Sequence, residues 1–433
     1  MSFRVKLVSL FAAAALFASG QAFAQEAAPA AAPEAAAEPE PAQRGVEEII
    51  ITATKRDANI QEVPIAVSAF QGDELEARRI DEIEDLAQVS PSIHVNTSNT
   101  ASAGGTLRIR GVGTTGNNIG LESSVGTFID GVYRSRAGQA FSDLLDIERI
   151  EILRGPQGTL FGKNTSAGAV NVVTKRPSLS DTEAFAQLEL GDFNHRRVAA
   201  SFSAPLIDEV LGIRLSAVWS KRDGIYEDFH SKDAWNDRKR FTMRGQLLWV
   251  PTDAIDVRLI ADFSERDESC CPAVWVRGGT TLGRVRTAAN AQGLGLDVPS
   301  AAIGRGPDVS HITGNKWHVG VNTAPFEDIK DGGISLEGNW DLDFMKLTSI
   351  TAWRKFDAHY AEDVDFGSAD VLHPQDPNGG GAYDIFTNFS EEIRAAGTVD
   401  AINTDWMFGF YGYTESVDTH TRIEYGADAG FAP

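Results

Sequence analysis

The sequence has 433 residues, a formal net charge of −22 and a hydrophobic content of 42%. A chain of this length accommodates about two or three domains, with enough apolar residues for real cores. The acidic balance argues against general nucleic-acid binding, because negative charge repels the phosphate backbone. After the N-terminus, no apolar run approaches the roughly 20 residues of a membrane-spanning helix, whereas alternating strands would escape this test.

The N-terminus has the order of a secretory signal. Arg4 and Lys6 form its positive region, residues 7–18 its apolar core, and Ala22-Phe23-Ala24 its small-residue cleavage site. We therefore expect export and cleavage near Ala24. The alternative, a membrane anchor helix, requires a longer apolar run.

Residues 25–46 consist largely of Ala, Pro and Glu without apolar periodicity, which predicts a flexible linker. Residues 47–56, EEIIITATKR, then place three isoleucines between charged and small polar residues. This short β-prone run has no evident partner, and an unpaired strand is a site at which another chain can add. Composition alone favours the alternative, an ordinary first strand of the next domain.

Residues 57–177 mix short strands, helices and glycine-rich loops, which indicates an α+β domain. Apolar residues between 73 and 89 recur at helical spacing and predict a helix that buries one face and leaves its carboxylates in water. Residues 106–110 predict a strand with Leu107 and Ile109 on one face. The glycines that follow match a dinucleotide fingerprint formally, but no helix start succeeds them, so we interpret them as a loop.

The stretch 146–177, DIERIEILRGPQGTLFGKNTSAGAVNVVTKRP, predicts a buried strand, a turn at Gly155-Pro156 and a returning strand at 171–175. It contains no catalytic constellation, because Ser166 has no histidine near it and the chain up to Pro177 contains one histidine, His94. We therefore expect a protein that is not an enzyme and that uses no cofactor or metal.

From residue 183 onward, apolar and polar residues alternate at period two, as in strands with one lipid-facing and one polar face. Short and long connections also alternate, which is typical of outer-membrane barrels. We predict strands at residues 183–190, 195–204, 210–222, 238–250, 255–266, 332–340, 344–356, 385–396 and 404–415. In the eighth strand, Glu391 is expected to face lipid, which is unfavourable, while Glu392 and Arg394 face inward.

Two adjacent cysteines, Cys270 and Cys271, are the only ones in the sequence. A vicinal pair does not easily meet ordinary disulfide geometry, and two ligands do not make a zinc site. A special loop disulfide and two incidental thiols both remain open.

Four segments, in this order, resemble the TonB-dependent outer-membrane receptors: EEIIITATKR (47–56), QEVPIAVSAF (61–70), LRIRGVG (107–113) and VGTFIDGVY (125–133). The stretch 146–177 continues the resemblance. It implies a TonB box at 47–56, an α+β plug domain at 57–177 and a partial transmembrane β-barrel at 183–433. This part comprises the first nine or so strands of an antiparallel barrel of about 22. The family's terminal aromatic strand is missing, so we expect a truncated sequence or a gene fragment.

The resemblance also implies roles for individual residues. The box residues that would bind the periplasmic protein TonB are Glu48, Ile49, Ile50, Ile51, Thr52 and Ala53. Arg110 and Arg154 would lock the plug to the barrel wall, where Glu392 in SEEIR resembles the family's partner glutamate. Arg108, Arg134 and Arg136 lie near plug loops and are candidates for attracting an anionic ligand; the alternative is simple surface charge.

The leading hypothesis is a receptor in the Gram-negative outer membrane, in contact with its lipid, that imports an external ligand with energy transmitted by TonB. Ferric siderophores and other iron complexes are the family's commonest cargo, and carbohydrate or cobalamin-type ligands are alternatives. A signalling receptor would carry a further folded domain before the box, and residues 25–43 are too short for one. A passive porin-like protein or a non-functional fragment is the remaining alternative.

Overall fold

The structure is a computed structural model that describes residues 49–425 with gaps. The undescribed segments in this range are 97–104, 115–120, 137–138, 140–142, 229–230, 273–316, 320, 322, 365–371, 375–380 and 403. The expected signal sequence, the linker and Glu48 lie outside the described residues. The chain divides into two units after Glu48, and every described residue belongs to the second unit.

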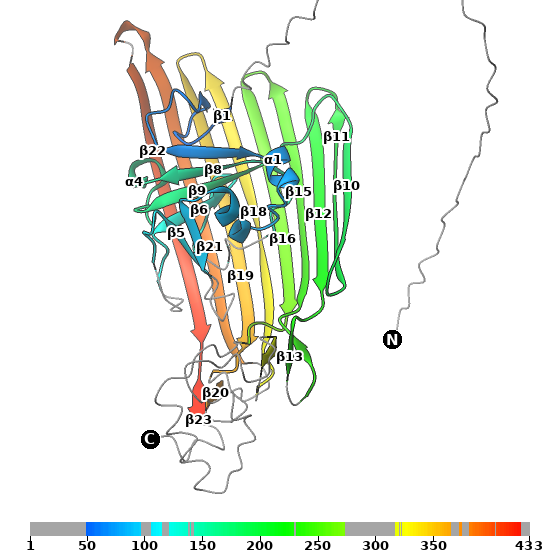
Figure 1. Cartoon of the computed structure of the whole chain (residues 1–433). Helices are drawn as coiled ribbons and strands as arrows, with labels where there is room; N and C mark the ends of the chain where they lie inside the picture. Colours follow the sequence, from blue (N-terminus) through cyan, green and yellow to red (C-terminus); the bar gives the residue numbers. More distant parts are fainter. Residues whose placement is uncertain are drawn as a thin grey trace, which may run out of the picture. The chain divides into compact units, whose positions relative to one another are not determined.

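Nine long strands form one antiparallel sheet whose order follows the sequence (Figure 1). They are β10 (Glu183–Gly191), β11 (His195–Ile207), β12 (Leu211–Arg222), β15 (Arg238–Thr252), β16 (Ile255–Glu268), β18 (Phe326–Leu342), β19 (Met345–Ala361), β21 (Ala382–Val399) and β22 (Thr404–His420). All nine predicted strands are therefore confirmed. The largest difference in bounds is at β18, which begins at Phe326 rather than at residue 332.

Successive residues of each strand lie on opposite faces of the sheet, and the two faces differ in exposure. Leu215, Trp219 and Met243 are exposed on one face, whereas Arg214 and Arg258 are buried on the other. The buried face packs against the N-terminal domain, because Arg214 and Arg258 contact that domain directly. We call this the inner face of the sheet.

The two ends of the sheet differ. Tight links join β11 to β12, β15 to β16, β18 to β19 and β21 to β22, and we call this the short-turn end. Longer connections follow β12, β16 and β19 at the opposite, long-connection end. These connections and the segment after β22 contain the small strands β13 (Tyr226–Asp228), β14 (Ala234–Trp235), β17 (His318–Val319), β20 (Leu372–Pro374) and β23 (Ile423–Tyr425).

The N-terminal domain, the plug, is built on a five-stranded mixed sheet in the order β3-β8-β9-β6-β7. The strands are β3 (Val67–Gln71), β8 (Ile147–Arg154), β9 (Gly168–Thr174), β6 (Val125–Ile129) and β7 (Val132–Arg134). A separate pair joins β4 (Ile93–Asn96) to β5 (Thr106–Ile109), and a short helix, α4 (Gly158–Phe161), follows β8. The strands expected near 106–110 and 171–175 are thus confirmed, and the plug lies against the inner face (Figure 1).

The single helix expected between residues 73 and 89 is wrong. The chain forms α1 (Gly72–Ala77), a 3-10 turn η1 (Ile83–Asp85) and α2 (Leu86–Val89) instead. The interruption includes Arg79, whose φ of 59° lies in the left-handed region and is incompatible with a continuous helix. The apolar residues still share one core, but Glu82 contacts Arg240 of the sheet rather than water. No helix in the described part of the chain is long and apolar enough to cross a membrane.

The Glu391 side chain lies on the outer face, as expected from its neighbours Phe389 and Ile393, which are both exposed. Ser349 donates a hydrogen bond of 2.9 Å to the Glu391 carboxylate, and the Thr351 hydroxyl donates another. Two hydroxyl groups of the adjacent strand β19 therefore satisfy the carboxylate that the sequence placed on an apolar surface.

One glycine of the plug tests how tightly its sheet is packed. Gly168 has a φ of 151°, and a Cβ atom there would lie 2.3 Å from the Leu153 carbonyl oxygen. We expect Gly168→Ala to lower the free energy of unfolding by about 1–3 kcal/mol, measured by urea unfolding of the purified chain in detergent. Gly158→Ala is the control, because its Cβ would meet nothing within 4 Å. Equal stability of the two variants would contradict this packing.

Candidate functional site

The first described strand, β1 (Ile50–Ile51), lies in residues 47–56, the segment that we call the box, and it is docked on the plug. The chain turns at Lys55 and returns as β2 (Ala58–Asn59), which pairs antiparallel with β1. The expectation that this strand has no partner is therefore wrong, because the partner lies only a few residues further along the chain. Ile51 and Ala53 are fully buried in a plug cluster that includes Phe161, whereas Ile50 is 42% exposed.

A buried carboxylate on β8 fixes the polar part of the box. Glu151 accepts hydrogen bonds from the Thr52 amide at 2.7 Å and from the Thr52 hydroxyl at 3.0 Å. Arg149 Nε at 2.8 Å and Asn171 Nδ2 at 3.1 Å donate to the same carboxylate. Thr52 thus occupies a site in which all surrounding polar groups have partners. The repeated charged positions of IERIE are visible in the sequence, but they do not distinguish Glu151 as a partner of the box.

The last two residues of the box, Lys55 and Arg56, connect it to the sheet. Lys55 Nζ lies 3.3 Å from the Glu392 carboxylate of β21 and 4.6 Å from the centre of the Phe161 ring. Burial lowers the pKa of Lys55, and the nearby Glu392 opposes that effect. Arg56 donates to the backbone carbonyls of Gly397 and Trp406, beside the tight link between β21 and β22. The box therefore lies toward the short-turn end.

The expected lock residues are not brought together as anticipated. Arg154 Nη2 donates to the Val67 carbonyl within the plug at 3.3 Å, and Arg110 is exposed. Among the described residues, neither arginine pairs with Glu392, which contacts Lys55 and Arg394 instead. Arg154 lies at the end of β8 and Arg110 after β5, so these strands direct both side chains elsewhere.

Several ion pairs between the plug and the sheet have the reverse of the expected polarity. In these pairs, the plug supplies the carboxylate and the inner face of the sheet supplies the arginine. Asp130, in the segment VGTFIDGVY, is 3.3 Å from Arg258 Nη1 and also accepts hydrogen bonds from the Thr174 amide and hydroxyl. Burial raises the pKa of the Asp130 carboxyl, but the guanidinium groups of Arg258 and Arg244 outweigh it and hold the pKa below its ordinary value. The carboxylate is therefore an ionised anchor.

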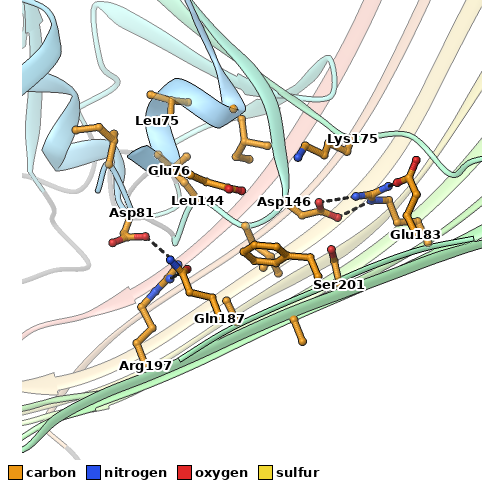
Figure 2. A pocket seen from close by; sticks show the side chains of 18 of the residues that line it. Leu75, Glu76, Asp81, Leu144, Asp146, Lys175, Glu183, Gln187, Arg197 and Ser201 are labelled. Carbon is orange, nitrogen blue, oxygen red and sulfur yellow. Dashed lines mark hydrogen bonds and ion pairs between the residues drawn. The ribbon is translucent and has the colours of Figure 1, made fainter. Parts of the chain in front are cut away.

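A second anchor is Asp146, which Arg214 contacts through two nitrogens at 2.6 and 2.7 Å. Burial raises the pKa of Asp146, but the hydrogen bonds from Arg214 and Ser216 outweigh that effect and hold the pKa below its ordinary value. This pair borders a cavity of about 170 Å³ between the plug and strands β10 to β12. Figure 2 shows Asp81 paired with Arg197 at another border of the cavity, at 3.1 Å.

The sequence predicts only one partner of each of these ion pairs. Inner-face arginines on consecutive strands were visible in the alternation, but their partners on the plug were not. A further plug carboxylate, Glu82, lies 3.1 Å from Arg240 and also contacts Arg238. Together with Asp81 and its partner Arg197 of β11, four plug carboxylates thus meet arginines of four sheet strands.

The candidate ligand residues lie toward the long-connection end. Arg134 and Arg136 are 5% and 7% exposed, so they are not simple surface charges. Arg136 contacts Glu415 of β22 at 2.8 Å, whereas Arg134 is 4.0 Å from Asp331 of β18. Two nitrogens of Arg134, Nε and Nη1, are buried without a hydrogen-bond partner among the described residues, as is Arg108 Nε.

Cys270 and Cys271 form a vicinal disulfide, one of the two states left open by the sequence. Their sulfur atoms and Glu327 form a group with metal-ligand spacing. A bonded sulfur is not a thiolate, and the thiolate is the form that binds metals, so the disulfide form offers no such site.

Comparison with known proteins matches residues 59–169 to the model of the TonB-dependent Receptor Plug Domain. The ferrichrome outer membrane transporter/phage receptor of Escherichia coli K12 is 25% identical over 223 residues, 50% of this chain and 28% of that protein. The pesticin receptor of Yersinia pestis is 23% identical over 376 residues, 86% of this chain and 49% of that protein. The chain thus spans about half or less of these relatives.

A similar fold occurs in the crystal structure of the ferric yersiniabactin uptake receptor FyuA from Yersinia pestis. The TM-score is 0.67 at 18% identity, and the alignment covers 83% of this chain and 50% of FyuA. The chain therefore shares with these proteins a plug-type domain at residues 59–169, followed by nine consecutive strands of a large antiparallel sheet. By name, these relatives are receptors, and one of them is also a transporter.

The anchors predict a difference between buried and exposed ion pairs. Asp130→Asn leaves Arg258 buried with less compensating charge, so we expect a loss of about 3 kcal/mol in the free energy of unfolding, measured with urea in detergent. Glu74→Gln is the control, because its pair with Arg78 is exposed. It should cost less than about 1 kcal/mol. A cost for Asp130→Asn no larger than for Glu74→Gln would refute the anchoring role.

Proposed function

We propose that the chain belongs to an outer-membrane receptor that binds an anionic iron complex and imports it with energy transmitted by TonB. The main observation that supports this proposal is that two sites lie apart on one plug. The docked box lies toward the short-turn end, and the buried Arg134 and Arg136 lie toward the long-connection end.

The two ends indicate the orientation. Outer-membrane barrels place short turns in the periplasm and longer loops outside the cell. The box would then face the periplasm, where TonB is available, and the arginines would face the external medium. The exposed apolar outer face, with Leu215 and Trp219, would contact outer-membrane lipid.

The chemistry of the second site favours an anion. Nε and Nη1 of Arg134 donate no hydrogen bond to any described residue, although Nη1 lies 4.0 Å from the Asp331 carboxylate. A guanidinium binds anionic oxygen atoms through charge-assisted hydrogen bonds, and such oxygen atoms also serve as ligands of ferric iron in chelates. The relatives include a ferrichrome transporter and a ferrioxamine receptor, which supports the same class of cargo.

The role of the box can be tested by crosslinking. A photoreactive amino acid at position 50, the exposed box position, should form an adduct with TonB in ligand-loaded cells that express the full gene. Leu206 is a matched control, because it is exposed near the short-turn end but lies outside the box. Absence of an adduct from position 50 would count against strand addition to TonB.

The ligand class can be tested by growth and uptake. A deletion strain that carries the restored full gene is supplied with single iron or carbon sources, and transport of each radiolabelled compound is measured. We expect rescue by a ferric complex and a roughly tenfold loss of its uptake in Arg134→Gln, because charge-assisted hydrogen bonds disappear. Arg196→Gln, at an exposed position of β11, is the control. Rescue only by a carbohydrate or cobalamin-type ligand, or uptake that persists after deletion of residues 47–53, would overturn the proposal.

A further inference from the structure

Glu151 is the buried carboxylate that the anchors to the sheet do not use. Its side chain is 0% exposed, and it lies on β8 inside the plug rather than against the inner face. The four donors that surround it come from Thr52, Arg149 and Asn171. Two of these donors belong to the box and two belong to the plug itself. The carboxylate therefore keeps partial compensation when the box leaves.

The Thr52 hydroxyl is part of the same network. It donates to Glu151 and lies 3.3 Å from both Arg149 Nη2 and Asn171 Nδ2, from which it accepts hydrogen bonds. Charge-assisted hydrogen bonds of this kind are stronger than neutral ones. The docked state of Thr52 is consequently favoured by a small, well-defined set of contacts.

The backbone of the box is occupied on two sides. The Thr52 amide donates to Glu151, and Ile50 and Ile51 pair with Asn59 and Ala58 of β2. A protein that binds the box by strand addition needs free main-chain groups along one edge of the strand. The Thr52 amide cannot serve Glu151 and such a partner at the same time.

We propose, on the basis of the role in TonB binding assigned above, that Glu151 is the positioning residue that holds the box closed. Docking at Thr52 and strand addition to TonB are mutually exclusive states of the same segment. The strength of the contact between Glu151 and Thr52 sets the fraction of receptors whose box is available without ligand.

Accessibility of Ala53 provides a test that does not require TonB. Ala53 is fully buried when the box is docked, so a cysteine introduced by Ala53→Cys should react slowly with a thiol reagent. The measurement uses outer membranes from cells that lack TonB and express the full gene, with the chain without an added cysteine as the blank. Adding Glu151→Gln should raise the labelling rate roughly tenfold, because the hydrogen bonds from the box then lose their charged acceptor.

Glu148→Gln is the matched control. Glu148 lies on the same strand and also contacts Arg149, but it makes no hydrogen bond to Thr52, and its side chain is 42% exposed. A second reporter, Ala167→Cys, lies in the separate core cluster of the plug. Faster labelling at position 53 but not at position 167 supports positioning, whereas equal acceleration at both positions shows general loosening and overturns the proposal.

If the Glu151→Gln variant fails to reach the membrane, Thr52→Val tests the same contact, because this substitution leaves the Glu151 carboxylate in place. It should accelerate labelling at position 53 several-fold through loss of the hydroxyl. An unchanged rate would overturn the proposal. Because the assay omits TonB, a positive labelling result with no crosslink from position 50 would retain the closed-box contact and reject only the proposed partner.

Discussion

Buried guanidinium groups on the inner face of the sheet determine how the plug can pack there. A buried arginine without a carboxylate carries a large desolvation cost, whereas a paired one is tolerated. The plug supplies the partners through Asp130, Asp146 and Glu82, which meet arginines of β16, β12 and β15. Charge complementarity thus specifies the position of the plug, and apolar contacts such as those of Leu145 with Ala199 and Val218 complete it.

The box follows the same physical rule within the plug. Its apolar side chains enter a core cluster, and its polar groups complete the surroundings of Glu151. The difference is that Glu151 retains a cationic donor of the plug, Arg149, when Thr52 departs, whereas Asp130 would lose its cationic partner Arg258 and keep only the neutral donors of Thr174. This asymmetry makes the box the more readily detached contact of the two, and it places the reversible contact at the periplasmic end of the proposed orientation.

Period-two alternation was sufficient to predict the nine strands, because inner and outer residues of each strand experience opposite environments. The same sequence could not identify the pairings across the interface. Lys55 and Glu392 are 337 positions apart, and no local pattern indicates that Lys55 rather than Arg110 or Arg154 reaches this glutamate. The expected helix at 73–89 failed for a local reason, since apolar spacing survives an interruption at Arg79 and therefore does not reveal it.

The order of contacts along the N-terminal segment has a mechanical consequence. A force applied to the chain before Ile50 reaches the short β1–β2 pair and Thr52 first, then Lys55 and Arg56, and only afterwards the sheet of the plug. Contacts loaded in series break one at a time, so each requires only its own rupture force. The ion pairs that anchor the plug to the inner face of the sheet act in parallel, so they share any applied force. The segment is thus arranged to peel away under tension well before the plug as a whole is displaced.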